Sequence, residues 1–350
     1  MSIFMKKYFC VLTLACAVAL AAATPTPGQT GNGRRAANSS PASTARAQQG
    51  TTAAATGLLA SLPTSDAVLS VDVRRLLSDA LPRAYNNNPA ELTRINSEID
   101  KFRTSTGLDA RSVERLVVGV SYRQTTAGKT LVETVAIARG NFRNASFAPS
   151  NRPVQEQKHA GKTIQIYSVD EQVKLIGLLN MRVTDVAVAM LDANTIAVGK
   201  LERVRAAIDA QAGRGRVAPE ITALATRDAN ALVGMGGNVP ASLTQNLDMG
   251  NISKSIASVR QFYSTLGTTA NGFNMLTALR TENASAAQSL STMIAGLKQL
   301  APFALGQMPA ARQRPLRSLV ENTRVNTEGN DVLITLELAQ VDVAALIDAF

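Results

Sequence analysis

Residues 115–139 read RLVVGVSYRQTTAGKTLVETVAIAR. Two segments rich in Val, Leu and Ile, at 115–122 and 130–139, flank the polar stretch 124–129. Runs of β-branched residues that are separated by a short loop with Gly are typical of a β-hairpin. This stretch therefore predicts two antiparallel strands, and a second hairpin follows at 183–191 and 195–199.

Helical segments alternate with these hairpins. Asn88 is suited to an N-cap, Pro89 to the first helical position and Glu91 to the third, so a helix is expected from Pro89 to Gly107. Leu201 opens a second helix that extends to about Gln211. Antiparallel hairpins packed with helices predict an α+β fold rather than a doubly wound parallel sheet.

The remaining segments are read by the same rules. Residues 140–160, with two prolines, are expected to form an irregular connection, and Pro302 is expected to stop a helix capped by Asn283. The further expectations are strands at 67–73, 163–169, 231–235 and 273–281, a helix at 252–266, and a hairpin of 319–325 with 332–338.

Four regions follow from these patterns: a signal peptide at 1–23, a disordered linker at 24–57, and α+β domains or halves at 58–215 and 216–350. Both halves begin with Asp-Ala, at Asp66 and Asp228, and both end in a hairpin and a helix. They are either two divergent repeats of one unit or two unrelated halves, and the sequence leaves both alternatives open.

The first 23 residues have the pattern of an export signal. Lys6 and Lys7 precede an uncharged apolar run, and the run ends in three alanines at Ala23. The apolar run is shorter than the roughly 20 residues that span a bilayer. Cleavage is expected between Ala23 and Thr24, which leaves no transmembrane span in the mature chain and places it in the periplasm or outside the cell.

A second processing route stays open. Thr13-Leu14-Ala15-Cys16 partly resembles a bacterial lipoprotein box, in which the Cys is lipidated, although Thr13 stands where the box has Leu. Cys16 is thus the alternative lipidation site, and lipidation would anchor the protein to a membrane.

The linker that follows has no apolar periodicity. Gly, Pro, Ser, Thr and Ala dominate residues 24–57, so the segment buries too little surface to offset its ordering entropy. It is interpreted as a flexible tether.

The composition excludes several chemistries. The chain has one His and two Cys, and both Cys lie within the first 23 residues. A His-rich or Cys-rich metal site, a haem or a disulfide framework lacks its ligands, so no cofactor and no metal are expected. The net charge of +10 falls to +8 on cleavage, because two Lys and no acid leave with the signal.

Candidate nucleotide motifs are interpreted as structural. Residues 127–130 and 160–163 both read AGKT, which resembles the end of a phosphate-binding loop, but both open strands and lack the first Gly of that motif. Residues 234–237 read GMGG, and Val239 stands where a dinucleotide fingerprint needs its third Gly. These glycines are expected to permit a bulge or a strand end.

The sequence predicts neither a catalytic site nor a nucleic-acid-binding site. His159 stands alone in a polar, turn-like stretch, and no spacing pairs the strand-associated acids Asp66, Asp72 and Glu133, so no catalytic residue is assigned. Nucleic-acid binding is not expected, because aromatic residues are only 4% and cannot supply a stacking surface. The cluster Arg312, Arg314 and Arg317 is expected to form a solvated helix start.

Three segments together resemble exported bacterial proteins of unknown function. They are KHAGKTIQIY at 158–167, LDANTIAVG at 191–199 and VRAAID at 204–209. The resemblance implies an envelope location and a duplicated α+β fold, and it supplies no catalytic residue. The expected function is that of a non-enzymatic envelope protein, a binding or structural module whose partner is an unknown envelope protein or polymer. The alternatives are a carboxylate-dependent hydrolase of the envelope and the membrane-anchored lipoprotein.

Intact-mass analysis of the protein purified from fractionated cells tests both processing routes. Cleavage after Ala23 gives a soluble product that begins at Thr24. A mass that includes a lipid on Cys16, together with release from membranes by Cys16→Ser, would establish the other route.

Overall fold

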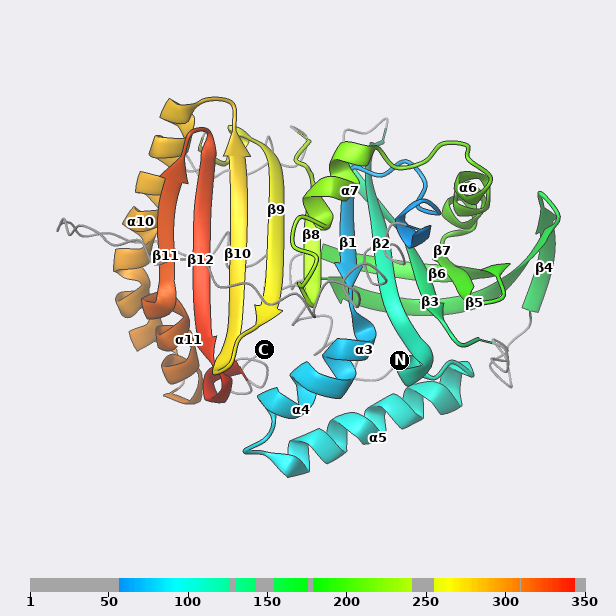
Figure 1. Ribbon diagram of the computed structural model, residues 1–350, viewed down its shortest axis with the longest axis horizontal. Coiled ribbons are helices and arrows are strands. Elements are labelled where there is room, and N and C mark those ends of the chain that lie inside the picture. The colour runs from blue at the N-terminus through cyan, green and yellow to red at the C-terminus, as the bar shows by residue number, and fades with distance from the viewer. Residues whose placement is uncertain are drawn as a thin grey trace, which may run out of the picture.

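The computed structural model describes residues 57–125, 130–142, 154–175, 179–240, 255–308 and 310–343. One twelve-stranded sheet crosses the molecule in the order β11-β12-β10-β9-β8-β1-β2-β3-β7-β6-β5-β4 (Figure 1). All adjacent strands are antiparallel, and helices pack on the sheet, so the fold is α+β as the hairpins predicted.

The first half of the chain supplies seven strands. They are β1 (Ala67–Val71), β2 (Val113–Gln124), β3 (Thr130–Gly140), β4 (Val154–His159), β5 (Lys162–Leu175), β6 (Leu179–Asp192) and β7 (Thr195–Gly199). Its helices are α3 (Val73–Arg75), α4 (Leu81–Ala84), α5 (Pro89–Thr106) and α6 (Leu201–Gln211), with a π-helical turn at Leu76–Ala80 and a 3₁₀ turn at Ala110–Ser112.

The second half supplies the other five strands. They are β8 (Val233–Asn238), β9 (Val259–Thr268), β10 (Gly272–Thr281), β11 (Thr323–Glu328) and β12 (Asp331–Ala339). Its helices are α7 (Pro219–Ala225), α10 (Ala284–Gly306) and α11 (Ala310–Asn322). Among the helices that the structure describes, none combines the length and apolar composition needed to cross a bilayer.

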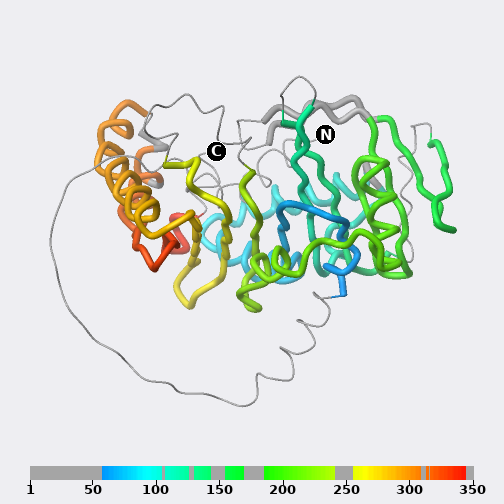
Figure 2. Tube along the Cα trace, turned by 90° about the horizontal axis from the view of Figure 1, so that it is seen from above, coloured from blue at the N-terminus to red at the C-terminus, as the bar shows by residue number. Residues whose placement is uncertain are grey.

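The sheet buries side chains on both faces at its centre. In β1, Val68 joins a core that includes α6 and α7, whereas Val71 joins a second core with α5, where Ile95 and Ile99 are buried. Neighbouring strand residues point to opposite faces, so β1 contributes to both cores. Figure 1 shows α5 running below the sheet, and Figure 2 shows α10 (orange) at one end of the molecule and β4 (green) at the other.

The expected helix at 252–266 is wrong over most of its length, because Val259–Thr268 forms β9. Val259, Phe262 and Leu266 are spaced as on a helix, but this strand pairs with β8 and β10 and lacks a simple alternation of buried and exposed residues. Ser264 and Thr277, whose hydroxyl oxygens lie 2.8 Å apart, form a buried cross-strand pair between β9 and β10.

Three other expected boundaries are corrected. Helix α10 continues through Pro302 to Gly306, and Pro302 is exposed, so water can bond the carbonyl that a proline leaves without a donor. Leu319 belongs to α11, and the hairpin strand begins only at Thr323, whose hydroxyl donates to the Leu319 carbonyl (2.7 Å). Residues 154–159, expected to be irregular, form β4 against β5.

The glycines of β8 explain how α7 approaches the sheet. A Cβ on Gly234 would lie 2.1 Å from the Ala225 carbonyl oxygen, and one on Gly236 would lie 2.4 Å from the Leu224 Cβ. The pairings of β8 with β1 and β9 run without a register shift, so the expected bulge is absent from this strand. These glycines allow the end of α7 to pack closely on β8.

We expect Gly234→Ala to lower the free energy of unfolding by about 1–3 kcal/mol, because the added methyl group overlaps a backbone carbonyl that cannot move alone. Gly306→Ala is the control, since a Cβ there would meet no side chain and no backbone from outside its own helix within 4 Å. Urea unfolding measures both. Equal effects of the two substitutions would contradict the close packing of α7 on β8.

Candidate functional site

Helix α10 packs one face on the second half of the sheet. Asn283 caps it, and the Asn283 side chain accepts a hydrogen bond from the Ala286 N–H (2.9 Å). Leu290 and Ile294 are buried in a cluster with Val332 and Ile334 of β12. Helices α10 and α11 lie together beside β11 and β12 in Figure 1.

The last turns of α10 expose large apolar side chains. Phe303 is 75% exposed, Leu300 is 53% exposed, and Met308, just beyond the helix, is 39% exposed. Ala301 and Leu305 in the same turns are buried, so this part of the helix is apolar on more than its sheet-facing side. We call Leu300, Phe303 and Met308 the α10 apolar surface. Clustered exposed apolar side chains mark interaction sites more often than scattered ones do.

Exposed cations lie on α11, the helix that follows this surface in the chain. The Gln313 amide donates to the Met308 carbonyl (2.7 Å), which ties the start of α11 to the end of the α10 apolar surface. Arg314 and Arg317 are exposed on α11, as expected for a solvated helix, and the side chain of Arg312 is outside the description. The helix joined to the α10 apolar surface thus carries exposed basic side chains, and we call Arg314 and Arg317 the basic margin.

Lys298 does not belong to this basic margin. Its ammonium group donates to the Thr323 carbonyl (2.5 Å), which fastens α10 to the start of β11. Burial lowers the pKa of Lys298, and the nearby Arg324 lowers it further. Lys298 thus holds the helix in place.

The three acids singled out in the sequence are engaged within the fold. Asp72 forms an ion pair with Arg115 (3.2 Å) and accepts from the Arg75 N–H (3.1 Å). Asp66 accepts from the Tyr122 N–H (2.8 Å). These contacts give both carboxylates structural partners.

The charges of Asp66 and Glu133 both influence Arg203, a relation that sequence spacing did not reveal. Burial lowers the pKa of Arg203 on α6, and the negative charges of Glu133 and Asp66 oppose that shift. Glu133 also pairs with Arg123 (2.7 Å). Both carboxylates therefore act on the same guanidinium through their charge, while the hydrogen bonds of Arg203 go to the Thr64 carbonyl (3.0 Å) and the Ser65 hydroxyl (3.0 Å).

His159 ends strand β4 and is half-buried, so its expected place in a turn is wrong. The turn is formed by the next two residues, Ala160 and Gly161, with φ of 46° and 77°. His159 Nε2 lies 3.1 Å from an oxygen of Asp209 on α6, and Arg205 of the same helix donates to the Gln157 side chain (2.5 Å). These contacts dock β4 on α6.

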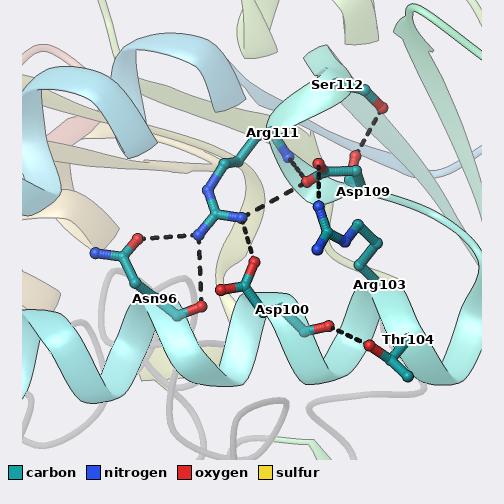
Figure 3. A network of polar contacts seen from close by, with 7 residues as sticks. All are labelled: Asn96, Asp100, Arg103, Thr104, Asp109, Arg111 and Ser112. Atoms are coloured by element: carbon teal, nitrogen blue, oxygen red, sulfur yellow. Dashed lines mark hydrogen bonds and ion pairs between the residues drawn. The ribbon is translucent and has the colours of Figure 1, made fainter.

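A second polar network fastens the end of α5 to the 3₁₀ turn (Figure 3). The Arg111 guanidinium donates to Asp100 (2.8 Å) and to the Asn96 side chain (3.2 Å), and the hydrogen bond to Arg111 lowers the pKa of Asp100. The Asp109 side chain accepts from the Arg111 N–H (2.9 Å). These exposed contacts join α5 to the 3₁₀ turn, so their role is to position the helix.

Several residues predicted to matter lie outside the described residues. They are the cleavage pair Ala23 and Thr24, the alternative lipidation site Cys16, and Ala127, Gly128 and Lys129 of the first AGKT string. Among the residues that are described, no group of three His, Cys, Asp or Glu side chains is placed to hold a metal ion.

The α10 apolar surface was not recognised in the sequence. The predicted stripe of this helix ended at Pro302, which separated Phe303 and Met308 from it. The usable signal was Leu300 and Phe303, which lie three residues apart and off the stripe formed by Leu290, Ile294 and Ala301.

No family model matches the chain, and no curated protein matches it. Three solved structures are similar over 83–84% of this chain: crystal forms I, III and IV of TP0453. Their identities to this chain are 12%, 14% and 13%, respectively, their TM-scores range from 0.39 to 0.43, and the chain covers 95–98% of each. Similarity at this level carries no inference about the activity of this chain.

Asp209 predicts an acid sensitivity. The hydrogen bond from Arg214 and then that from His159 lower the pKa of Asp209. A folded-state pKa below the unfolded value of about 3.9 adds stability above that value, and this stability is lost as the pH falls through the folded-state pKa.

Asp209→Asn should therefore lower stability at pH 7 and flatten the decline of stability below about pH 4. Urea unfolding from pH 7 to pH 2 measures this, with Glu328→Gln on β11 as an exposed control at the other end of the sheet. If the acid limb of Asp209→Asn keeps its wild-type slope, the Asp209 contacts do not contribute.

Proposed function

We propose that this protein is an exported, non-enzymatic binding module of the cell envelope. The signal pattern of residues 1–23 and the tether at 24–57 support export and a flexible attachment. The observation that carries the binding role is the 75% exposure of Phe303 beside Leu300 on a helix that the sheet holds in place. An exposed aromatic side chain that a partner would remove from water is a typical anchor of a binding interface.

The surroundings of Phe303 define the chemistry of the partner. Arg314 and Arg317 are exposed on the adjoining helix, and Gln313 connects that helix to Met308. A protein segment with apolar side chains flanked by Asp or Glu would satisfy both parts of the surface. We therefore assign the partner to the class of acidic, partly apolar segments of an envelope protein.

We also propose that the two halves arose by duplication. Counting outward from the centre, the first half runs β1-β2-β3-β7-β6 and the second half runs β8-β9-β10-β12-β11. In both orders the third strand is followed by the last and then by the penultimate strand. The hairpin β4–β5 in one half and the pair α10–α11 in the other occupy the same place in the chain.

The markers that suggested a repeat in the sequence give it less support. Asp66 directly precedes β1, whereas Asp228 lies several residues before β8, and residues 346–349 are outside the described residues. A profile comparison of the two halves across homologous sequences tests the duplication. Alignment of β1 with any strand other than β8 would count against it.

The two alternatives have separate tests. A carboxylate-dependent hydrolase needs a catalytic Asp or Glu, whereas Asp66, Asp72 and Glu133 each have a structural partner in the fold. Turnover of a cell-wall or peptide substrate, abolished by Asp66→Asn, would establish the hydrolase. A lipid anchor on Cys16 is compatible with the binding role and is tested by the mass measurement described above.

A photocrosslinking amino acid in place of Phe303 tests the binding surface in intact cells. We expect one protein product, and we expect Arg314→Glu with Arg317→Glu to abolish it by reversing the basic margin. The same crosslinker at Leu131, another exposed apolar residue at 40% exposure, is the control and should not yield that product.

Affinity for the purified crosslinked protein completes the test. Phe303→Ser should weaken binding about 30-fold or more if Phe303 is the anchor. Crosslinks to lipid alone, or an affinity that Phe303→Ser leaves unchanged, would contradict a protein-binding surface at the end of α10.

A further inference from the structure

The two ends of the sheet differ in what packs beside the last strand. At one end, α10 packs against β11, and Lys298 of that helix donates to the Thr323 carbonyl at the start of the strand. At the other end, β4 is the last strand, and its partner among the described strands is β5 (Figure 1). An edge strand presents backbone N–H and C=O groups that can pair with another strand.

The turn after β4 determines which backbone groups face outward. Positive φ angles at Ala160 and Gly161 define a two-residue hairpin, whose closing pair, His159 and Lys162, is hydrogen-bonded. Hydrogen-bonded and non-bonded positions alternate along an antiparallel pair. Gln157 and His159 therefore bond toward β5, and the backbone groups of Val154, Glu156 and Lys158 point to the open edge.

The side chains at the open edge carry opposite charges. Glu156 and Lys158 are both exposed, and as neighbours two apart they lie on the same face of β4. On the other face, the Gln157 and His159 side chains contact Arg205 and Asp209 of α6, which holds the strand in place. The edge is thus a fixed strand with one acid and one base.

We propose that β4 pairs with β4 of a second copy of this chain, antiparallel about a two-fold axis at Gln157. In this register Glu156 of each copy faces Lys158 of the other, which gives two attractive cross-strand pairs. About four backbone hydrogen bonds form at these two pairs, because the N–H and C=O groups of Glu156 and Lys158 point to the open edge. The two sheets then continue into one.

Neighbouring registers lack this complementarity. A shift of the axis to Glu156 places the two Glu156 carboxylates opposite each other, and a shift to Lys158 opposes two ammonium groups. Like charges directly opposite each other destabilise a strand pair. The order of Glu156 and Lys158 along β4 therefore selects one register, and this pairing is independent of the binding role assigned to α10.

Sedimentation equilibrium of the purified protein between about 10 µM and about 1 mM tests the pairing, since a short edge makes a weak interface. The wild-type protein should show a concentration-dependent dimer. Glu156→Lys alone and Lys158→Glu alone should each lower dimer affinity at least about tenfold. Each substitution turns both cross-strand pairs from opposite charges into like charges.

Combining the two charge reversals in two ways makes the test specific to the register. The double variant Glu156→Lys with Lys158→Glu restores opposite charges and should dimerise again. An equimolar mixture of the two single variants should form a heterodimer, in which every pair is attractive. Arg324→Glu on β11, at the opposite edge, should leave the dimer unchanged. A monomer throughout this concentration range, or a dimer that the single reversals leave intact, would overturn the proposal.

Discussion

The structure depends on the antiparallel pairing of β1 with β8. This pairing joins strands from the two halves of the chain, with Leu69 opposite Met235 at its middle, and it turns two smaller sheets into one. The strands are short, and the close packing around them compensates. Gly237 lies against Ala67, and Gly234 and Gly236 accept the end of α7. Larger side chains at these positions would separate the layers that meet at the centre of the sheet.

Each half builds outward from this centre and ends differently. In the second half, α10 packs on the sheet near its end, and its buried side chains join the cluster around Val332 and Ile334. The first half extends through β6 and β5 to β4, and α6 supports this extension through Asp209 and Arg205. Helix α10 also presents Phe303 to solvent, and the extension of the first half ends in β4. The two proposed contacts therefore lie at opposite ends of the sheet (Figure 1).

Sequence reasoning succeeded where local signals decide local structure. The cap at Asn88, the hairpin of β2 with β3 and the cap at Asn283 each combine a periodic apolar pattern with a recognisable boundary residue. It failed at β4, which reads VQEQKH and has no apolar alternation, because pairing with β5 and contacts with α6 hold that strand in place. It failed at β9 because a strand between two partners can show a helical spacing by coincidence.

The amino-acid sequence by itself determined the α+β class, the near absence of imidazole and thiol chemistry, and the pattern of an export signal, since these follow from composition and short-range periodicity. Only the tertiary structure decided that the charges of Asp66 and Glu133 both act on Arg203, that His159 meets Asp209, and that Phe303 is exposed. Such contacts join residues distant in the chain, and the solvent exposure of a side chain depends on what packs around it. Neither these long-range contacts nor the exposure of a side chain can be predicted from the spacing of residues along the chain.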